Sequence, residues 1–271
     1  MAHLRKPALP LLLLSVFLFL YPCPLKAACP ASSLLADLAA VPEISYEIKS
    51  RLPHDPDAFT QGLLYLDGLL YESTGRYGAS SLRIIDPLTG TIRKRLQLPA
   101  TVFGEGLASS GRKMFQLSWK EQTAFVYRLP DLTELPAFSY VGEGWGLTAD
   151  DNAFYMSDGS AEITIRSLAD FSPIRQITVH DGNRFFTMIN ELEMAEQQLY
   201  ANIWQEDVIL RIDPASGEVT GYIDTRGLFW PGRPCRKGEK AINGIAYNKD
   251  ADIFYLTGKN WPFIFLVKFS Q

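Results

Sequence analysis

The sequence contains few histidines and no excess of positive charge. It has 3 His among 271 residues, and 26 Lys and Arg stand against 30 Asp and Glu. His54 and His180 do not occur in a spacing, such as H-x-x-x-H, that places two imidazoles on one ion. The sequence therefore argues against a histidine-bound zinc centre and against a basic surface for nucleic acid. We expect no metal, no other cofactor and no nucleic-acid partner.

Long hydrophobic runs are also missing. The apolar stretch at 11–20 is too short to span a bilayer. It follows a basic start and precedes Ala27, a small residue that suits signal cleavage, although a cut after Ala28 or an uncleaved anchor would also fit. We predict that residues 1–27 are a secretory signal peptide. The mature chain, 28–271, is then periplasmic or secreted, without a stable membrane anchor, and we expect a monomer.

Cysteine is scarce too, with 3 in the whole sequence. Removal of the signal peptide leaves Cys29 and Cys235, an even pair in an oxidising compartment. We predict a disulfide between them, and two unpaired thiols are the alternative. Lys26, three residues before Cys29, disfavours lipid attachment at that cysteine. The mass change of the purified protein on reduction and alkylation decides between the alternatives.

Glycine, proline and aromatic residues, in contrast, are abundant and spread along the chain, as in proteins built from short strands and turns. A short apolar strand pattern recurs five times, at intervals of about 40 to 53 residues. Each copy is followed by a turn and a second strand, then by a third and often a fourth. The first strands of the five units are FTQGLLY, FGEGLAS, GWGLTA, INELEMA and INGIAYN.

Four short strands in a unit of about 40 to 45 residues are typical of a β-propeller blade. Five units predict an all-β, five-bladed β-propeller that fills residues 28–271 as a single catalytic domain. The last unit has room for only three strands before the chain ends. The alternating segment 44–52 can supply the fourth, so that an N-terminal strand closes the last blade. Residues 30–42 suit a short helix.

Equivalent positions of the five units should converge, because the first strand of every blade lines the central axis. The innermost strands place polar or aromatic residues at the same position, namely Gln61, Glu105, Trp145, Asn190 and Asn243. The second strands end at Gly75, Trp119, Gly159, Trp204 and Lys259. Together these residues predict an aromatic cage with an acid/base group inside it. We expect Trp230 and Trp261, outside this alignment, to be packing or rim residues.

The motifs FTQGL, FGEGL, EGWGLT with SDGS, INELE, ANIW, INGIAYN and FYLTGKNWP follow one another in this order. They cover the chain from His54 to the C-terminus, and in this it resembles the plant- and bacterial-type glutaminyl-peptide cyclotransferases. The resemblance implies a five-bladed propeller enzyme that converts the N-terminal glutamine of peptides or proteins into pyroglutamate and releases ammonia. It implies that Glu105 is the acid/base catalyst. The substrate pocket would be lined by Phe59, Gln61, Phe103, Trp119, Trp145, Asn190, Trp204 and Lys259.

Cyclisation requires the substrate α-amine to attack its own γ-carboxamide, so the protein must position one flexible side chain and move one proton. We expect Glu105 to accept the amine proton and pass it to the departing ammonia. Lys259 and Asn190 are expected to stabilise the oxyanion. Two alternatives are a calcium-dependent lactonase-like hydrolase, which needs several convergent carboxylates, and a non-enzymatic propeller that binds peptides or sugars, which needs no Glu105 with Lys259.

Overall fold

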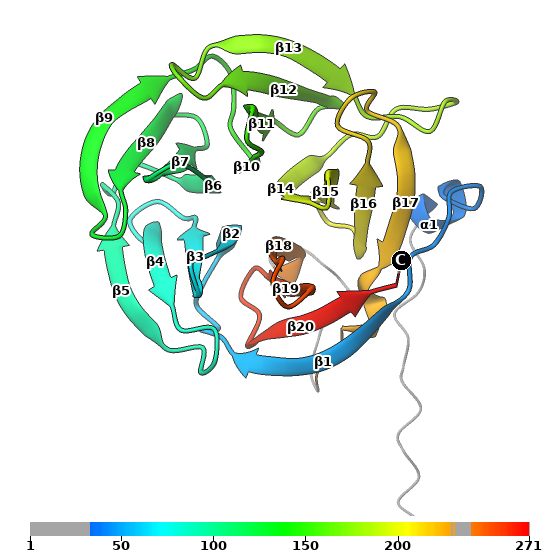
Figure 1. The fold of residues 1–271 in the computed structure, drawn as a ribbon, viewed down its shortest axis with the longest axis horizontal. Coiled ribbons are helices and arrows are strands. Elements are labelled where there is room, and N and C mark those ends of the chain that lie inside the picture. The colour runs from blue at the N-terminus through cyan, green and yellow to red at the C-terminus, as the bar shows by residue number, and fades with distance from the viewer. Residues whose placement is uncertain (1–32, 229, 231–239, 271) are drawn as a thin grey trace, which may run out of the picture.

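The computed structural model describes residues 33–228, 230 and 240–270. Their strands form five four-stranded antiparallel sheets arranged as blades around a central axis (Figure 1). The predicted signal peptide at 1–27 and both cysteines of the predicted disulfide lie outside the described residues. Within the described part of the chain, no helix is long and apolar enough to cross a membrane.

The first four blades each take four consecutive strands, ordered from the axis outward. Blade 1 consists of β2 (Thr60–Leu66), β3 (Leu69–Thr74), β4 (Ser81–Ile85) and β5 (Ile92–Gln97). Blade 2 consists of β6 (Gly104–Ser110), β7 (Lys113–Ser118), β8 (Thr123–Arg128) and β9 (Thr133–Ser139). Blade 3 consists of β10 (Leu147–Ala149), β11 (Ala153–Ser157), β12 (Glu162–Ser167) and β13 (Pro173–Thr178). Blade 4 consists of β14 (Ile189–Ala195), β15 (Gln198–Ile203), β16 (Val208–Ile212) and β17 (Val219–Asp224).

The last blade combines the two ends of the chain, as the sequence predicts. It consists of β18 (Ile242–Asn248), β19 (Ile253–Gly258), β20 (Phe263–Phe269) and β1 (Tyr46–Pro53). The outermost strand β1 pairs antiparallel with β20, from Tyr46 opposite Phe269 to Pro53 opposite Phe263. In Figure 1 the blue β1 runs along the outside of the red β20 and completes the ring. Two short helices, α1 (Ser33–Asp37) and η1 (Thr225–Gly227), complete the described elements, and α1 lies where the helix is predicted.

Burial explains which strands lie inside and which outside. Inner strands are buried on both faces, as in β3 and β6, and their sequences are correspondingly apolar or small. The outer strand β5, IRKRLQ, is exposed along nearly its whole length. The core lies between neighbouring sheets, for example where Phe115 of blade 2 packs against Phe154 of blade 3 with ring centroids 4.6 Å apart.

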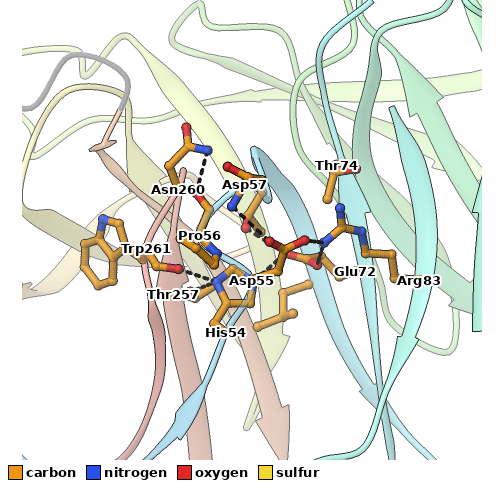
Figure 2. A network of polar contacts seen from close by, with 12 residues as sticks. His54, Asp55, Pro56, Asp57, Glu72, Thr74, Arg83, Thr257, Asn260 and Trp261 are labelled. Carbon is orange, nitrogen blue, oxygen red and sulfur yellow. Dashed lines mark hydrogen bonds and ion pairs between the residues drawn. The ribbon is translucent and has the colours of Figure 1, made fainter. Parts of the chain in front are cut away.

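A buried polar network joins the first blade to the last (Figure 2). His54 Nδ1 lies 2.7 Å from the carbonyl oxygen of Trp261, and Nε2 lies 2.8 Å from Oε1 of Glu72 on β3. Arg83 on β4 donates to Asp55 at 2.9 Å and also contacts Glu72. Both ring nitrogens of His54 face oxygen atoms, and the doubly protonated imidazolium can donate to both.

Electrostatics agree with this protonation state. Burial by itself lowers the pKa of His54, but the charge and hydrogen bond of Glu72 outweigh it, so the pKa lies above its usual value. The pKa of Glu72 is lowered despite its burial, because His54, Arg83 and Thr60 stabilise its charge. The network holds together the segment leading into β2 and the loop after β19, and both carry residues of the predicted site.

Candidate active site

A cavity of about 430 Å³ opens at one mouth of the ring, beside the starts of the inner strands and the ends of the second strands. It is lined by Phe59, Gln61, Phe103, Glu105, Trp119, Trp145, Asn190, Trp204, Gln205 and Lys259. All nine residues that the sequence predicts for the site are therefore brought together. Trp230 and Trp261 lie elsewhere and pack on each other with ring centroids 4.9 Å apart, as their prediction as packing residues requires.

Irregularities in strand pairing explain how polar side chains reach this cavity from otherwise apolar strands. In blades 1, 2, 4 and 5 the register of the innermost strand against its neighbour shifts near the start of the strand. The shifts fall at Gln61, Glu105, Asn190 and Asn243. Such a bulge re-aims a side chain locally. The position that repeats in the sequence therefore coincides, in these four blades, with a register shift between the innermost strand and its neighbour.

Two glycines at the ends of second strands make room for aromatic rings. A Cβ built on Gly75 would lie 2.2 Å from the ring of Phe103, and one on Gly159 would lie 2.7 Å from the ring of Trp145. Gly159 also has φ of +84°, which disfavours any other residue. The corresponding positions in the remaining blades carry Trp119, Trp204 and Lys259, whose side chains line the cavity. In blades 1 and 3 the glycine at this position leaves room for a neighbouring aromatic ring.

Glu105 is buried and held on one side only. Its Oε1 accepts a hydrogen bond of 2.6 Å from Nε2 of Gln61. The amide of Gln61 is oriented in turn by Asn243, whose Nδ2 donates to Gln61 Oε1 at 3.0 Å and to the carbonyl of Thr60. Glu105 is 4% exposed, and its Oε2 has no hydrogen-bond partner among the described residues. One carboxylate oxygen is therefore left for a ligand.

Burial gives Glu105 and Lys259 unusual protonation behaviour. Desolvation raises the pKa of Glu105 well above the usual carboxylate value, with smaller contributions from the negative charges of Glu143 and Glu121, while Lys259 and Gln61 oppose the shift. Desolvation lowers the pKa of Lys259 to about 8, although the charge of Glu105 opposes it. Burial thus raises the pKa of the carboxyl group and lowers the pKa of the amine, a combination that is common among acid/base groups of active sites.

Aromatic rings surround these two groups. Phe103 meets Phe59 and Trp119 edge-on at centroid distances of 6.1 and 5.5 Å. Trp145 and Trp204 meet edge-on at 5.7 Å. The ammonium of Lys259 lies 4.8 Å from the centroid of Phe59 and 6.0 Å from that of Trp204, within the range of cation–π attraction.

Sequence reasoning missed two residues of this region. Gln205 lines the cavity next to Trp204, one position outside the repeated alignment. Glu143 accepts hydrogen bonds at Oε2 from the indole nitrogens of both Trp119, at 2.7 Å, and Trp145, at 3.0 Å. Nothing in the repeats connects Glu143 with Trp119, because that contact joins two different blades.

Among the described residues that line the cavity, Glu105 is the only carboxylate. Within the same part of the chain, no group of three or more His, Cys, Asp or Glu side chains is placed to hold a metal ion. The chemistry available from the lining is one carboxyl group, one amine and three amides within an aromatic wall.

This combination of fold and site agrees with comparisons to known proteins. A family described as glutamine cyclotransferase matches residues 18–269. The chain belongs to the glutamine cyclotransferase family. Its expected five-bladed fold and its expected family membership are both confirmed. Membership makes the protein an enzyme of the glutaminyl-peptide cyclotransferase class.

Relatives in the glutamine cyclotransferase family include a plant and a bacterial protein. The chain is 37% identical over 270 residues to a glutaminyl-peptide cyclotransferase from Arabidopsis thaliana. The alignment covers 97% of this chain and 83% of the relative. The fold resembles the crystal structure of Myxococcus xanthus glutaminyl cyclase, with a TM-score of 0.77 and 32% sequence identity. That match covers 85% of this chain and 98% of the other.

Proposed function

We propose that the protein converts the N-terminal glutamine of peptides or proteins into pyroglutamate and ammonia, with Glu105 as a metal-independent general acid and base. The observation that carries the proposal is Oε2 of Glu105. This buried carboxylate oxygen has no hydrogen-bond partner in the described part of the chain and belongs to an aromatic cavity that Lys259 also lines. The reaction itself is supported by the family and by the activity for which the plant and bacterial relatives are named.

The cavity suits the reactive end of such a substrate. A glutamine side chain and its α-amine are small, and a wall made of Trp119, Trp145 and Trp204 excludes water around them. Folding the side chain back on its own amine costs conformational freedom, which binding in a close-fitting cavity supplies before the reaction begins. The rest of the peptide extends out of the mouth of the cavity, so the site recognises the N-terminal residue of a chain.

One proton moves during the reaction. As the substrate amine nitrogen bonds to the γ-carboxamide carbon, Glu105 Oε2 accepts a proton from the amine. As the bond from that carbon to the carboxamide nitrogen breaks, Glu105 donates the same proton to the departing nitrogen, which leaves as ammonia. Glu105 ends as the carboxylate with which it began. Desolvation raises the pKa of Glu105, which makes its carboxylate a stronger base toward the amine proton.

Negative charge develops on the carboxamide oxygen between these two steps. The ammonium of Lys259 supplies a charged donor to this oxygen, and the amide of Asn190 supplies a neutral one. Asn190 is 2% exposed and lines the cavity, and its side-chain NH₂ is the group that would donate to this oxygen. Gln61 keeps Glu105 in place throughout.

The single carboxylate of the lining favours this reaction over a calcium-dependent hydrolase, which needs several carboxylates around one ion. A propeller that only binds peptides or sugars would use the tryptophans, but it would have no use for a desolvated carboxyl group beside an amine. Burying such groups in a cavity is costly, and perturbed acid/base groups are common in active sites.

The test is turnover of a dipeptide that begins with glutamine, followed as ammonia release and as a mass loss of about 17 Da, the mass of the ammonia expelled in the intramolecular acyl transfer. We expect turnover with and without a chelator, and we expect Glu105→Gln to keep the melting temperature but lose at least about a thousandfold in rate, as general acid/base and orientation effects together imply. Glu134→Gln, on the exposed outer strand β9, is the matched control. A folded wild-type protein without turnover would contradict the proposal, and chelator-sensitive turnover would contradict its metal-independent part.

We also propose that the enzyme acts outside the cytoplasm, on the strength of the basic start and the apolar segment 11–20. The expected result is a mature N-terminus at residue 28 or 29 in the exported fraction. Recovery of the uncut chain from the cytoplasm would refute this.

A further inference from the structure

The carboxylate of Glu143, outside the cavity, accepts hydrogen bonds from two tryptophans that line it. Trp119 follows the second strand of blade 2, and Trp145 precedes the short inner strand of blade 3. Both indole N–H groups donate to the same atom, Oε2 of Glu143. The Glu143 side chain is 40% exposed at the rim, and its other oxygen lies 3.8 Å from Nζ of Lys120.

The hydrogen bonds to Glu143 engage the single N–H donor of each indole ring, in Trp119 and in Trp145. An indole has a single hydrogen-bond donor, so one partner decides how its polar edge points. A charged acceptor makes a stronger bond than a neutral one. Lys120 adds a third contact, because its ammonium lies 3.9 Å from the ring centroid of Trp119. The two rings are therefore fixed relative to each other across the gap between two blades.

The orientation of these rings extends to the rest of the wall. Trp145 meets Trp204 edge-on, and Trp119 meets Phe103 in the same manner. Four of the aromatic residues that line the cavity are thus connected to a single rim carboxylate. Its charge also acts over a longer range, since it contributes to the raised pKa of Glu105.

Building on the function proposed above, we infer that Glu143 is a positioning residue for the cyclisation, which holds Trp119 and Trp145 in the orientation that accepts the substrate glutamine. The role has two separable parts. The geometric part acts on the fit of the substrate and so on KM. The electrostatic part acts on the proton affinity of Glu105 and so on the acidic limb of the pH profile.

Two variants separate these parts. Glu143→Gln removes the charge but retains an amide oxygen that can accept from the two indoles, whereas Glu143→Ala removes both. We expect KM to rise about tenfold in Glu143→Ala, with kcat changed by less than about threefold, as loss of two charge-assisted hydrogen bonds to the wall implies. In Glu143→Gln we expect KM within about threefold of the wild type. Removing the negative charge should shift the acidic limb of kcat/KM to lower pH in both variants.

Glu134→Gln, on the outermost strand of blade 2, removes one negative charge far from the indoles and serves as the control. It should leave both KM and the acidic limb unchanged. Equal melting temperatures of all the variants show that the ring itself is intact.

Nuclear magnetic resonance tests the contact without any reference to turnover. The protein has 5 Trp, and their indole N–H signals can be assigned one by one. In Glu143→Ala the signals of Trp119 and Trp145 should move, and in Glu143→Gln they should move less. Unmoved signals, or a wild-type KM in Glu143→Ala, would overturn the inference. Failure of the proposed function would look different, because the wild-type protein itself would then show no turnover.

Discussion

Gln61 donates a hydrogen bond of 2.6 Å to Glu105, and a second hydrogen bond, from Asn243, fixes the orientation of the Gln61 amide. Asn243 donates to the amide oxygen of Gln61, so the amide NH₂ must point to Glu105. The bond engages only Oε1 of the carboxylate, and the buried Oε2 has no hydrogen-bond partner among the described residues. A chain of two amides, from blades 5 and 1, thus decides which oxygen of a blade 2 carboxylate is available.

The first prediction follows from this hydrogen bond. Gln61 stabilises the charged form of Glu105, so Gln61→Ala should raise the pKa of Glu105 further. The acidic limb of kcat/KM should move to higher pH, and the rate at pH 7 should fall about tenfold, as general base catalysis requires the carboxylate. A pH profile of ammonia release measures both effects. An acidic limb that stays in place in Gln61→Ala would show that this hydrogen bond does not control Glu105.

The second prediction concerns the alkaline side of the profile. The pKa of Lys259 is lowered to about 8, so its positive charge is present below that pH and is lost as the pH rises through it. Lys259→Arg retains the charge and should move the alkaline limb upward. Lys259→Met should lower kcat by about a hundredfold or more, as the loss of an oxyanion donor does. An alkaline limb that does not move in Lys259→Arg would assign that limb to another group.

The third prediction tests the space that glycine provides. Gly159→Ala places a Cβ against the ring of Trp145 at a residue with positive φ, so we expect a higher KM together with a lower melting temperature. Gly78→Ala is the matched control, because Gly78 has φ of +77° with nothing within 4 Å of the added Cβ. Both variants should lose about 1 kcal/mol from backbone strain, but only Gly159→Ala should change KM. Equal KM values in the two variants would refute the steric argument.

The fourth prediction concerns stability at the seam between the first and last blades. The pKa of His54 is raised, so its contribution to the free energy of unfolding is complete below pH 6.5 and is lost as the pH rises through the value in the folded protein. The charged groups around it are Glu72, Arg83 and Asp55.

His54→Asn leaves the charge of Glu72 without its closest charged partner and should destabilise the protein by about 3 kcal/mol at pH 6, as removal of one member of a buried ion pair does. The difference from the wild type should shrink toward pH 9. Thermal unfolding between pH 5.5 and 9 measures this. His180→Asn, in the segment between β13 and β14, is the control. A His54→Asn deficit that is constant with pH would contradict the assigned protonation state.

Much of this site is predictable from the repeats alone. The recurrence of the inner strands places Gln61, Glu105, Trp145 and Asn190 at one level of the ring, because a propeller repeats its geometry with every blade. The second strands add Trp119, Trp204 and Lys259 by the same argument. The closing strand is predictable because the final unit lacks an outer partner. The observed strand, Tyr46–Pro53, begins two residues later than the predicted segment 44–52 and ends one residue later.

The rest depends on contacts that a repeat cannot encode. Glu143 acts between blades 2 and 3, so its role requires the distance between two rings rather than a position in one unit. Asn243 has the register of a site residue yet is not among the lining residues and orients Gln61 from behind. Glu191 is buried among the inner strands and accepts the backbone N–H groups of Leu63 and Ile245, a use that no local pattern shows.

The pairing of β1 with β20 has a consequence for how the protein is made. Ser45 and Ser270, which hydrogen-bond at the end of this pair, lie 225 positions apart in the chain. A ribosome therefore releases almost the whole polypeptide before the two strands can meet, and pairing across so large a separation is slow to form. Lys259 belongs to the same late-formed blade, so a nascent or truncated chain lacks both the closed ring and the ammonium of the cavity. We therefore expect the cavity to be complete only after β18, β19 and β20 have assembled with β1.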